Sequence, residues 1–119
     1  MREKIKNYIL QNNLHAGWVV TCAGSLTGYN IRFANQEKRS KGKGLFEVVS
    51  IIGTTSKNGN HLHISISDSI GKTIGGQLLK GCIVYTTAEI IIQSTTDLNF
   101  KRENDSSTPW EELQIEKIK

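Results

Sequence analysis

The chain has 119 residues, of which 37% are hydrophobic and 22% are charged, and it contains one proline and two cysteines. This composition excludes a disordered chain, a collagen-like repeat and a small disulfide scaffold, and the length predicts one domain over residues 1–119. We find neither a secretion signal nor the ~18 consecutive apolar residues of a membrane span, so we expect a cytoplasmic protein without a membrane partner. Cys22 and Cys82 form no Cys-x-x-Cys pair, which predicts reduced, buried thiols.

The net charge of +4 is concentrated in one short segment. Lys38, Arg39, Lys41 and Lys43 lie close together, and Glu37 is their acidic neighbour. Serine and glycine separate these charges, so we expect a flexible basic loop rather than a helical stripe. Such a loop can contact the phosphates of nucleic acid. The alternative is a solvated loop that only keeps the protein soluble.

The first predicted element is an amphipathic helix, because Ile5, Tyr8 and Ile9 recur at three- and four-residue spacing before Asn12-Asn13. From Trp18 onward the pattern is typical of β-structure. The elements expected next are a strand at Trp18–Cys22, a turn at Gly24–Gly28, a strand at Tyr29–Phe33 and, after the basic loop, a strand at Leu45–Ile52.

The second half of the chain alternates more clearly. In His61–Ser67 the apolar residues face one way and the polar residues the other. Turn signals at Asn58-Gly59 and Asp68–Gly71 flank this strand and predict hairpins. Further strands are expected at Lys72–Leu79, Cys82–Gln93 and Asp97–Arg102.

The tail is ambiguous, since Thr108-Pro109 has the form of a helix start, whereas Leu113 and Ile115 alternate as in a strand. Taken together, the elements predict an α+β domain in which an N-terminal helix precedes six to eight strands of a largely antiparallel sheet.

His61-Leu62-His63 is the clearest chemical signal. Residues two apart on a strand lie ~6.6 Å apart on the same face, so both imidazoles can reach one metal ion. If the next hairpin turns at Ser69-Ile70 with a slight slip, Gln77 lies opposite His63. A glutamine oxygen is a poor zinc ligand beside imidazole, so two histidines packed at an interface are an equally good interpretation.

Two carboxylates on predicted strands, Glu47 and Glu89, are further candidates for holding a metal or acting as a base. No nucleophile motif is present. Gly71-Lys72-Thr73 lacks the glycine that a phosphate-binding loop needs five residues earlier, where Ile66 stands. We therefore assign no catalytic residue and expect a binding protein rather than an enzyme.

Several linked motifs resemble the PPC (plants and prokaryotes conserved) domain, and they follow one another in the family's order over about Ile5 to Phe100. They are Gly44-Leu45-Phe46-Glu47-Val48-Val49-Ser50 with Gly53, His61-Leu62-His63-Ile64-Ser65, Gly75-Gly76-Gln77-Leu78-Leu79-Lys80-Gly81-Cys82 and Thr86-Thr87-Ala88-Glu89. Cys22-Ala23-Gly24-Ser25-Leu26 followed by Ile31-Arg32-Phe33 fits the family's first hairpin.

The resemblance implies a homotrimer of the stand-alone prokaryotic type, whose members are usually described as DNA-binding. It also implies a metal site in some members, formed by His-x-His and the histidine of Gly-Gly-His. Zinc or a similar divalent metal would here be held by His61, His63 and Gln77, with Glu89 as a further candidate, and Gln77 replaces the family's third histidine. The segment Gly44, Leu45, Phe46 and Glu47 is a candidate partner contact, in which Leu45 replaces the family's arginine. An Arg-Gly-Arg-Pro minor-groove hook is absent from the sequence.

These observations predict a homotrimeric module that binds DNA or regulatory proteins, with the basic segment as the candidate DNA contact. The alternatives are a trimer that binds a metal or small ligand, including a metal-dependent enzyme, and a purely structural assembly protein. A trimer also agrees with the pattern, because the strands carry more apolar residues than one helix can cover. These residues are Val48, Ile51, Ile83, Ile90, Ile91 and Ile92.

Overall fold

The computed structural model describes residues 1–104 and 106–118. Within this part of the chain, one helix is followed by seven strands, which confirms the predicted α+β class. In chain order they are α1 (Arg2–Gln11), β1 (Gly17–Arg32), β2 (Ser40–Ser56), β3 (Gly59–Ser67), β4 (Thr73–Leu78), β5 (Ile83–Ser94), β6 (Leu98–Asn104) and β7 (Glu111–Lys117). The strand pairings are antiparallel. None of the described residues belongs to a helix long and apolar enough to cross a membrane.

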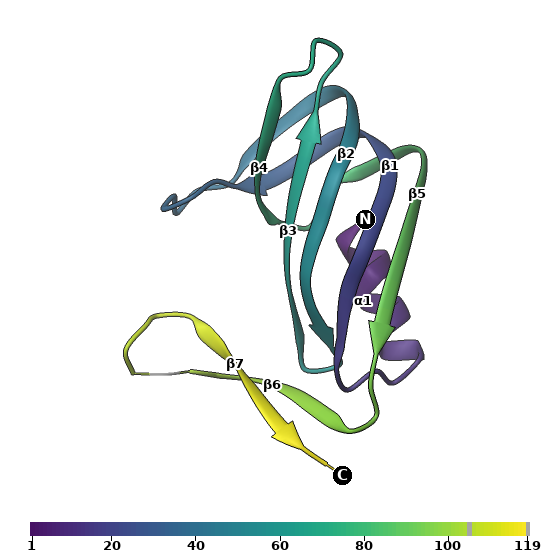
Figure 1. The fold of residues 1–119 in the computed structure, drawn as a ribbon. Coiled ribbons are helices and arrows are strands. Elements are labelled where there is room, and N and C mark those ends of the chain that lie inside the picture. The colour runs from purple at the N-terminus through teal and green to yellow at the C-terminus, as the bar shows by residue number, and fades with distance from the viewer. Residues whose placement is uncertain (105, 119) are drawn as a thin grey trace.

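Four of the strands close into a ring (Figure 1). β1 pairs with β2, β2 with β3 and β3 with β4, and β4 then returns to the end of β1 through Ile31↔Leu78 and Arg32↔Gln77. β5 pairs with β1 from Gly17 to Gly28, on the edge that β4 uses further along the strand. β1 is long enough for β5 and β4 to pair with this one edge in succession.

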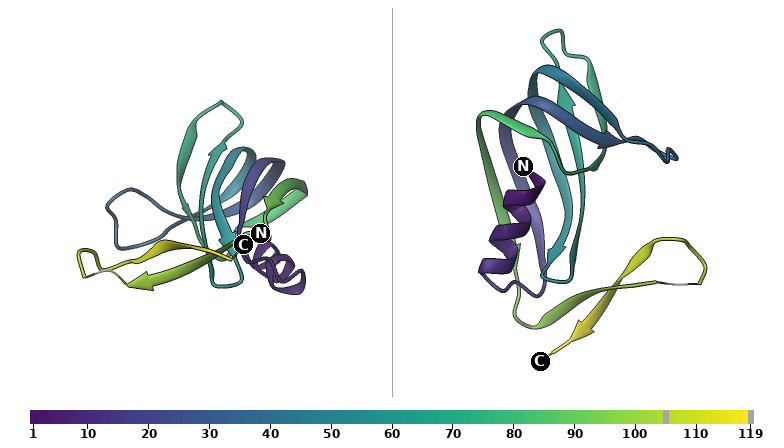
Figure 2. Two further views of the ribbon diagram at one scale, coloured as in Figure 1. Left: turned by 60° about the horizontal axis from the view of Figure 1, so that its bottom comes forward. Right: turned by 180° about the vertical axis from the view of Figure 1, so that it is seen from behind.

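The core fills the ring and the space between the sheet and α1. Leu62, Ile64 and Ile66 of β3 point inward and are at most 2% exposed, as their alternation predicted. The helix contributes Ile5 and Ile9 from one face, and Figure 2 shows α1 lying along β1 and β5. Burying a side chain of this size contributes roughly 1.5–3 kcal/mol, so the apolar face of α1 is what holds the helix on the sheet.

The turn predicted at Gly24–Gly28 is wrong, and with it the expected first hairpin. β1 runs through this segment without a break and is flanked by β2 and β5. The pairing register shifts at Leu26 and Gly28, so the glycines accompany irregularities of a long strand. A Cβ at Gly24 would lie 2.5 Å from the backbone oxygen of Thr87, which shows that this glycine permits close approach of β5. Glycine marks both turns and such close contacts, and the sequence pattern does not separate them.

The basic segment is also more ordered than predicted. β2 begins at Ser40, so Lys41 and Lys43 lie on a strand, where they pair with Asn30 and Gly28 of β1. Only residues 33–39 connect the two strands, and this connection projects away from the ring (Figures 1 and 2). The prediction of a flexible loop over the whole segment failed because strand pairing overrides the low β-propensity of glycine and lysine.

The tail that the sequence left ambiguous forms a strand, β7. β6 and β7 form a separate hairpin with the pairs Phe100↔Ile115 and Arg102↔Leu113, so the alternation of Leu113 and Ile115 was the correct signal. The hairpin extends away from the ring (Figures 1 and 2). Its base is fixed by Phe100, whose N–H donates to the backbone oxygen of His15 at 2.8 Å and whose own oxygen accepts from the Ser56 hydroxyl at 2.9 Å.

Candidate functional site

The two histidines of β3 lie on the outer face of the ring. His61 and His63 are exposed, while Leu62 between them is buried. Their ring centroids are 5.1 Å apart and the ring planes meet at 85°, so the imidazoles contact each other edge to face. The strand alternation therefore brings the two rings together, as expected for residues two apart.

Gln77 lies directly opposite His63 in the β3–β4 pairing, at the register that the hairpin turn indicated. Its side-chain oxygen, however, accepts a hydrogen bond from the Arg32 guanidinium. Arg32 and Gln77 are also paired along the backbone, where β4 meets the end of β1. The amide oxygen that was a candidate metal ligand is thus engaged by a cation.

Arg32 makes a second contact, which the sequence did not indicate. Its guanidinium carbon lies 4.7 Å from the centre of the Trp110 ring, a cation–π arrangement between β1 and the β6–β7 hairpin. Trp110 remains 56% exposed. The Thr108 hydroxyl holds the residue by accepting from the backbone N–H of Trp110 at 3.4 Å and donating to Glu112 at 3.0 Å. No local pattern marks Arg32 or Trp110, because their contact depends on how the hairpin folds back.

The electrostatics around His61 disfavour positive charge. Partial desolvation of the ring is the largest cause that lowers the pKa of His61, and the charges of His63, Arg102 and Arg32 lower it further, while Glu112 opposes them. Arg102 is held beside this histidine by a 2.8 Å hydrogen bond to the Thr54 hydroxyl, and Thr54 pairs with His61. The cations that hinder protonation of the imidazole also repel a metal ion.

The side chains present here do not fit a zinc ion. Structural and catalytic zinc sites use three or four Cys, His or carboxylate ligands, and residues 1–104 and 106–118 contain no cluster of three such residues. Glu89 does not complete the set within one chain. It lies on β5, where it pairs with Ala23 of β1, and β1 and β2 separate β5 from β3. Whether Glu89 of another subunit approaches the histidines stays a prediction.

A large groove opens beside this cluster. Its volume is about 1150 Å³, and it lies between the β1–β2 connection, the β3–β4 hairpin and the segment before β7. The residues that line it are Arg32, Phe33, Ala34, Asn35, Gln36, Glu37, Lys38, His63, Gly75, Gly76, Gln77, Pro109 and Trp110. The close approach of β4 to the end of β1 at this groove requires glycine at position 76, since a Cβ on Gly76 would lie 2.4 Å from the backbone oxygen of Arg32.

The basic segment spans the end of the same connection and the start of β2. Lys38, Arg39, Lys41 and Lys43 are all exposed. Lys41 and Lys43 are two apart on β2 and therefore share one face of the strand. Gly42 between them lies under the Tyr29 ring, because a Cβ there would be 2.4 Å from that ring. The four charges thus belong to the ordered end of a hairpin and not to a wholly flexible loop.

The candidate partner contact Gly44–Glu47 continues β2 beyond these lysines. Leu45 is 60% exposed and Glu47 is also exposed, whereas Phe46 is half-buried. Phe46 packs edge to face on Tyr29, with ring centroids 5.3 Å apart. Leu45 and Glu47 are therefore available to a partner, and whether they contact one stays a prediction.

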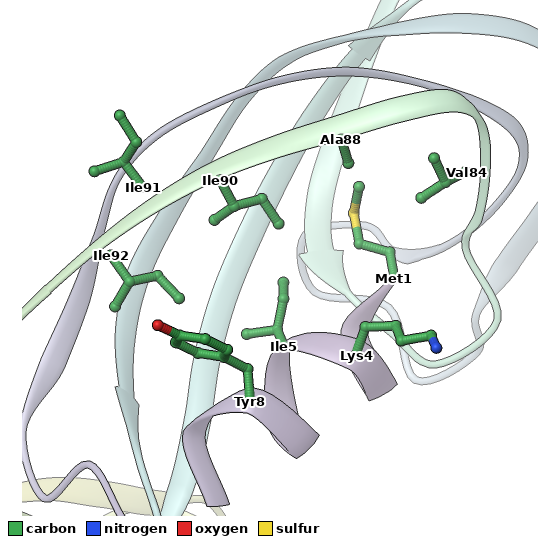
Figure 3. Close-up of a pocket in the computed structure, with 9 residues that line it drawn as sticks. All are labelled: Met1, Lys4, Ile5, Tyr8, Val84, Ala88, Ile90, Ile91 and Ile92. Atoms are coloured by element: carbon green, nitrogen blue, oxygen red, sulfur yellow. The ribbon is translucent and has the colours of Figure 1, made fainter. Parts of the chain in front are cut away.

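A second, apolar pocket of about 620 Å³ separates α1 from β5. Figure 3 shows Ile5 and Tyr8 of the helix facing Ile90 and Ile92 of β5, while Ile91 points away. Tyr8 was expected on the buried face of α1, but it is 52% exposed and lines this pocket. Residues from a helix and an edge strand thus leave apolar surface uncovered within one chain.

Comparisons with known proteins agree with this fold. A curated relative, the bifunctional protein GlmU of Synechococcus sp. (strain JA-3-3Ab), is 34% identical over 118 residues, which is 99% of this chain. The chain spans only 19% of that relative's length.

Two solved structures are similar over nearly the whole chain. A hypothetical protein from Salmonella cholerae-suis has 36% identity and a TM-score of 0.96, covering 99% of this chain and 86% of that one. A candidate DNA-binding protein from Ralstonia eutropha JMP134 has 17% identity and a TM-score of 0.82, covering 96% and 83%, which shows a shared fold. The Plants and Prokaryotes Conserved (PCC) domain matches residues 1–96. The chain therefore belongs to the Plants and Prokaryotes Conserved domain family, abbreviated PPC or PCC.

Proposed function

We propose that this protein is a homotrimeric binding module that associates with duplex DNA through the basic segment Lys38, Arg39, Lys41 and Lys43. The observation that carries the proposal is the placement of four exposed cations at one end of the projecting β1–β2 hairpin. Cations placed in this way can neutralise DNA phosphates and release counterions. The net charge of +4 and the similarity to a candidate DNA-binding protein from Ralstonia support it.

The homotrimer is supported by apolar surface that one chain leaves uncovered. Ile83, Tyr85 and Ile91 of β5 are each more than half exposed. β5 is the end strand of the sheet and lies beside the apolar pocket of Figure 3. A second copy of the chain would cover this strand and pocket. A trimer would also present the basic segment three times and so strengthen DNA binding by avidity.

The proposed module acts as one domain in the cytoplasm. The β6–β7 hairpin is bonded to the ring through Phe100 and Arg102, which supports a single folding unit. Cys22 and Cys82 are free and buried, and burial raises the pKa of both thiols. Free thiols of this kind are typical of a reducing compartment.

An electrophoretic mobility shift with duplex DNA at low salt tests the proposal. We expect the parent protein to shift DNA and a variant with Lys38, Arg39, Lys41 and Lys43 all replaced by glutamine to shift it at least about tenfold less well. The matched control replaces four exposed lysines elsewhere, Lys6, Lys57, Lys72 and Lys117, and therefore has the same net charge. Equal loss in the two variants, or no shift by the parent at low salt, would contradict the proposal.

A further inference from the structure

The groove beside the histidines combines features that the duplex-DNA proposal does not use. It is open to solvent, and its volume of about 1150 Å³ slightly exceeds the ~300–1,000 Å³ typical of small-molecule sites. Its lining includes Gly75 and Gly76, which have no side chains to fill it, and Pro109 and Trp110 from the segment before β7. The groove therefore offers both an aromatic side chain and polar groups to a ligand.

Trp110 lines this groove, and two contacts restrain it. Arg32 covers one side of the indole at 4.7 Å, and the backbone of Trp110 is held by the Thr108 hydroxyl. The side chain is nevertheless 56% exposed. The part of the ring that Arg32 does not cover is therefore open to stacking by a planar group.

The charges around the groove favour an anion. Arg32 and Lys38 line it against one carboxylate, that of Glu37, and Arg39 belongs to the adjoining hollow that Arg32 also lines. The Arg32 guanidinium is oriented by its hydrogen bond to Gln77, and the His63 ring lies beside this pair. A guanidinium held in this way presents its remaining N–H groups to phosphate oxygens.

Neutral polar side chains complete the lining. Asn35 and Gln36 of the β1–β2 connection also line the groove. Each amide both donates and accepts hydrogen bonds, which is the chemistry that reads the edge of a nucleobase.

We propose that this groove binds a nucleotide unit, whose base stacks on Trp110 and whose phosphate contacts Arg32 and Lys38. The unit belongs either to a free nucleotide or to single-stranded nucleic acid, because stacking and phosphate contact are common to both. The site is distinct from the face formed by Lys41 and Lys43, so it does not depend on duplex binding. Arg32, which disfavours a cation beside the histidines, is one of the two groups that attract the phosphate.

Fluorescence of Trp110 tests this directly. A Trp18→Phe background leaves Trp110 as the only tryptophan, since the chain has two. This protein is titrated with adenosine 5′-monophosphate, uridine 5′-monophosphate, a single-stranded oligodeoxythymidylate, ribose 5-phosphate and inorganic phosphate. We expect saturable quenching by a nucleotide or the oligonucleotide, and affinity about tenfold or more weaker for ribose 5-phosphate, because the stacking contribution is missing.

Calorimetry on variants separates the contribution of Trp110, which stacks on the base, from that of Arg32, which contacts the phosphate. Trp110→Ala is expected to weaken nucleotide binding about tenfold or more, while Trp110→Phe, which keeps a ring, recovers most of the affinity. Arg32→Gln is expected to weaken binding of the nucleotide more than binding of the corresponding nucleoside, because only the nucleotide has the phosphate that Arg32 contacts. The control is Ile115→Ala, which removes an exposed apolar side chain from the same hairpin without touching the groove.

The outcomes are decisive in either direction. Quenching by mononucleotides identifies a small-molecule site, and quenching by the oligonucleotide alone identifies a single-strand site. Either result supports the proposal when calorimetry shows that Trp110→Ala weakens binding of the same ligand. No saturable signal at millimolar ligand, equal affinity for ribose 5-phosphate and nucleotide, or undiminished binding by Trp110→Ala would overturn it. The duplex-DNA proposal is unaffected by these results, because Trp110→Ala leaves Lys38, Arg39, Lys41 and Lys43 in place.

Discussion

The guanidinium of Arg32 lies 4.7 Å from the centre of the Trp110 ring, and this contact joins the end of β1 to the β6–β7 hairpin. The hairpin forms its own two-stranded sheet and extends from the ring, so contacts of this kind decide where it lies. The same guanidinium donates to Gln77, which brings β4 into the arrangement. Arg32 therefore organises both the histidine face and the groove beside it.

Arg32→Ala is expected to lower the free energy of unfolding by about 1–2 kcal/mol, because it removes a cation–π contact and leaves the Gln77 oxygen without its donor. Trp110 should become more mobile, with red-shifted fluorescence. Urea denaturation and tryptophan emission measure the two effects. Arg39→Ala, at an exposed arginine nearby, is the control and should change neither.

Gln77→His is expected to raise zinc affinity, because it adds an imidazole opposite His63. The gain should be larger in Gln77→His combined with Arg32→Ala, since the guanidinium beside the site repels the ion. Calorimetric zinc titration measures both, and Gln93→His on β5 controls for adventitious binding by a new histidine. If neither variant binds zinc more tightly than the parent, the three positions do not converge on one ion.

The parent protein is expected to have a mass in solution near three times 13.3 kDa. Ile91→Glu should shift it toward the monomer, because a charge on the exposed face of the end strand cannot be buried against another copy. Light scattering measures the mass. Ile70→Glu, at the 86% exposed tip of the β3–β4 turn, should leave it unchanged. A parent protein that scatters as a monomer refutes the trimer.

The free energy of unfolding is expected to fall as the pH drops below about 6.5. Folding lowers the pKa of His61 from its ordinary value of 6.5, chiefly through burial, so the unfolded chain takes up this proton first. The contribution of His61 is therefore complete above that value and is lost at lower pH. Denaturation at a series of pH values should show a flatter profile for His61→Gln. Nuclear magnetic resonance of His63→Gln should show the pKa of His61 rising toward 6.5, because the charge of His63 is one cause of its depression.

Gly76→Ala is expected to destabilise the fold by about 1–3 kcal/mol, since the new Cβ would lie 2.4 Å from the backbone oxygen of Arg32. Gly28→Ala is the matched control, because a Cβ there would meet its nearest atom at 3.7 Å, an ordinary contact. Thermal denaturation compares the two. Equal stability of both variants would mean that β4 and β1 are less closely apposed than the structure shows.

Much of the fold was predictable because its signals are local. The alternation of Leu62, Ile64 and Ile66 and the turn at Asp68–Gly71 fix the face and register of β3, and hence the position of Gln77 opposite His63. These features depend on neighbours within one hairpin. The family motifs agree with them and extended the prediction to the whole sheet.

The remaining features depend on contacts between distant segments. The glycines at Gly24–Gly28 were interpreted as a turn, because only the approach of β5 reveals their packing role. The tail was left open, since proline suggested a helix while pairing with β6 decides for a strand. The contact between Arg32 and Trp110 has no sequence signature at all. The sequence therefore predicted the two histidines of the candidate site, but it did not predict that Arg32 lies beside them.

The salt dependence of duplex-DNA binding tests the central claim most directly. Fluorescence anisotropy with a labelled duplex gives the slope of log K against log salt concentration, which reports the number of phosphates contacted. We predict a steep negative slope for the parent and for the control lacking Lys6, Lys57, Lys72 and Lys117. The variant lacking the charges of Lys38, Arg39, Lys41 and Lys43 should lose most of that slope. Identical slopes for the two variants would show that DNA does not contact the basic segment.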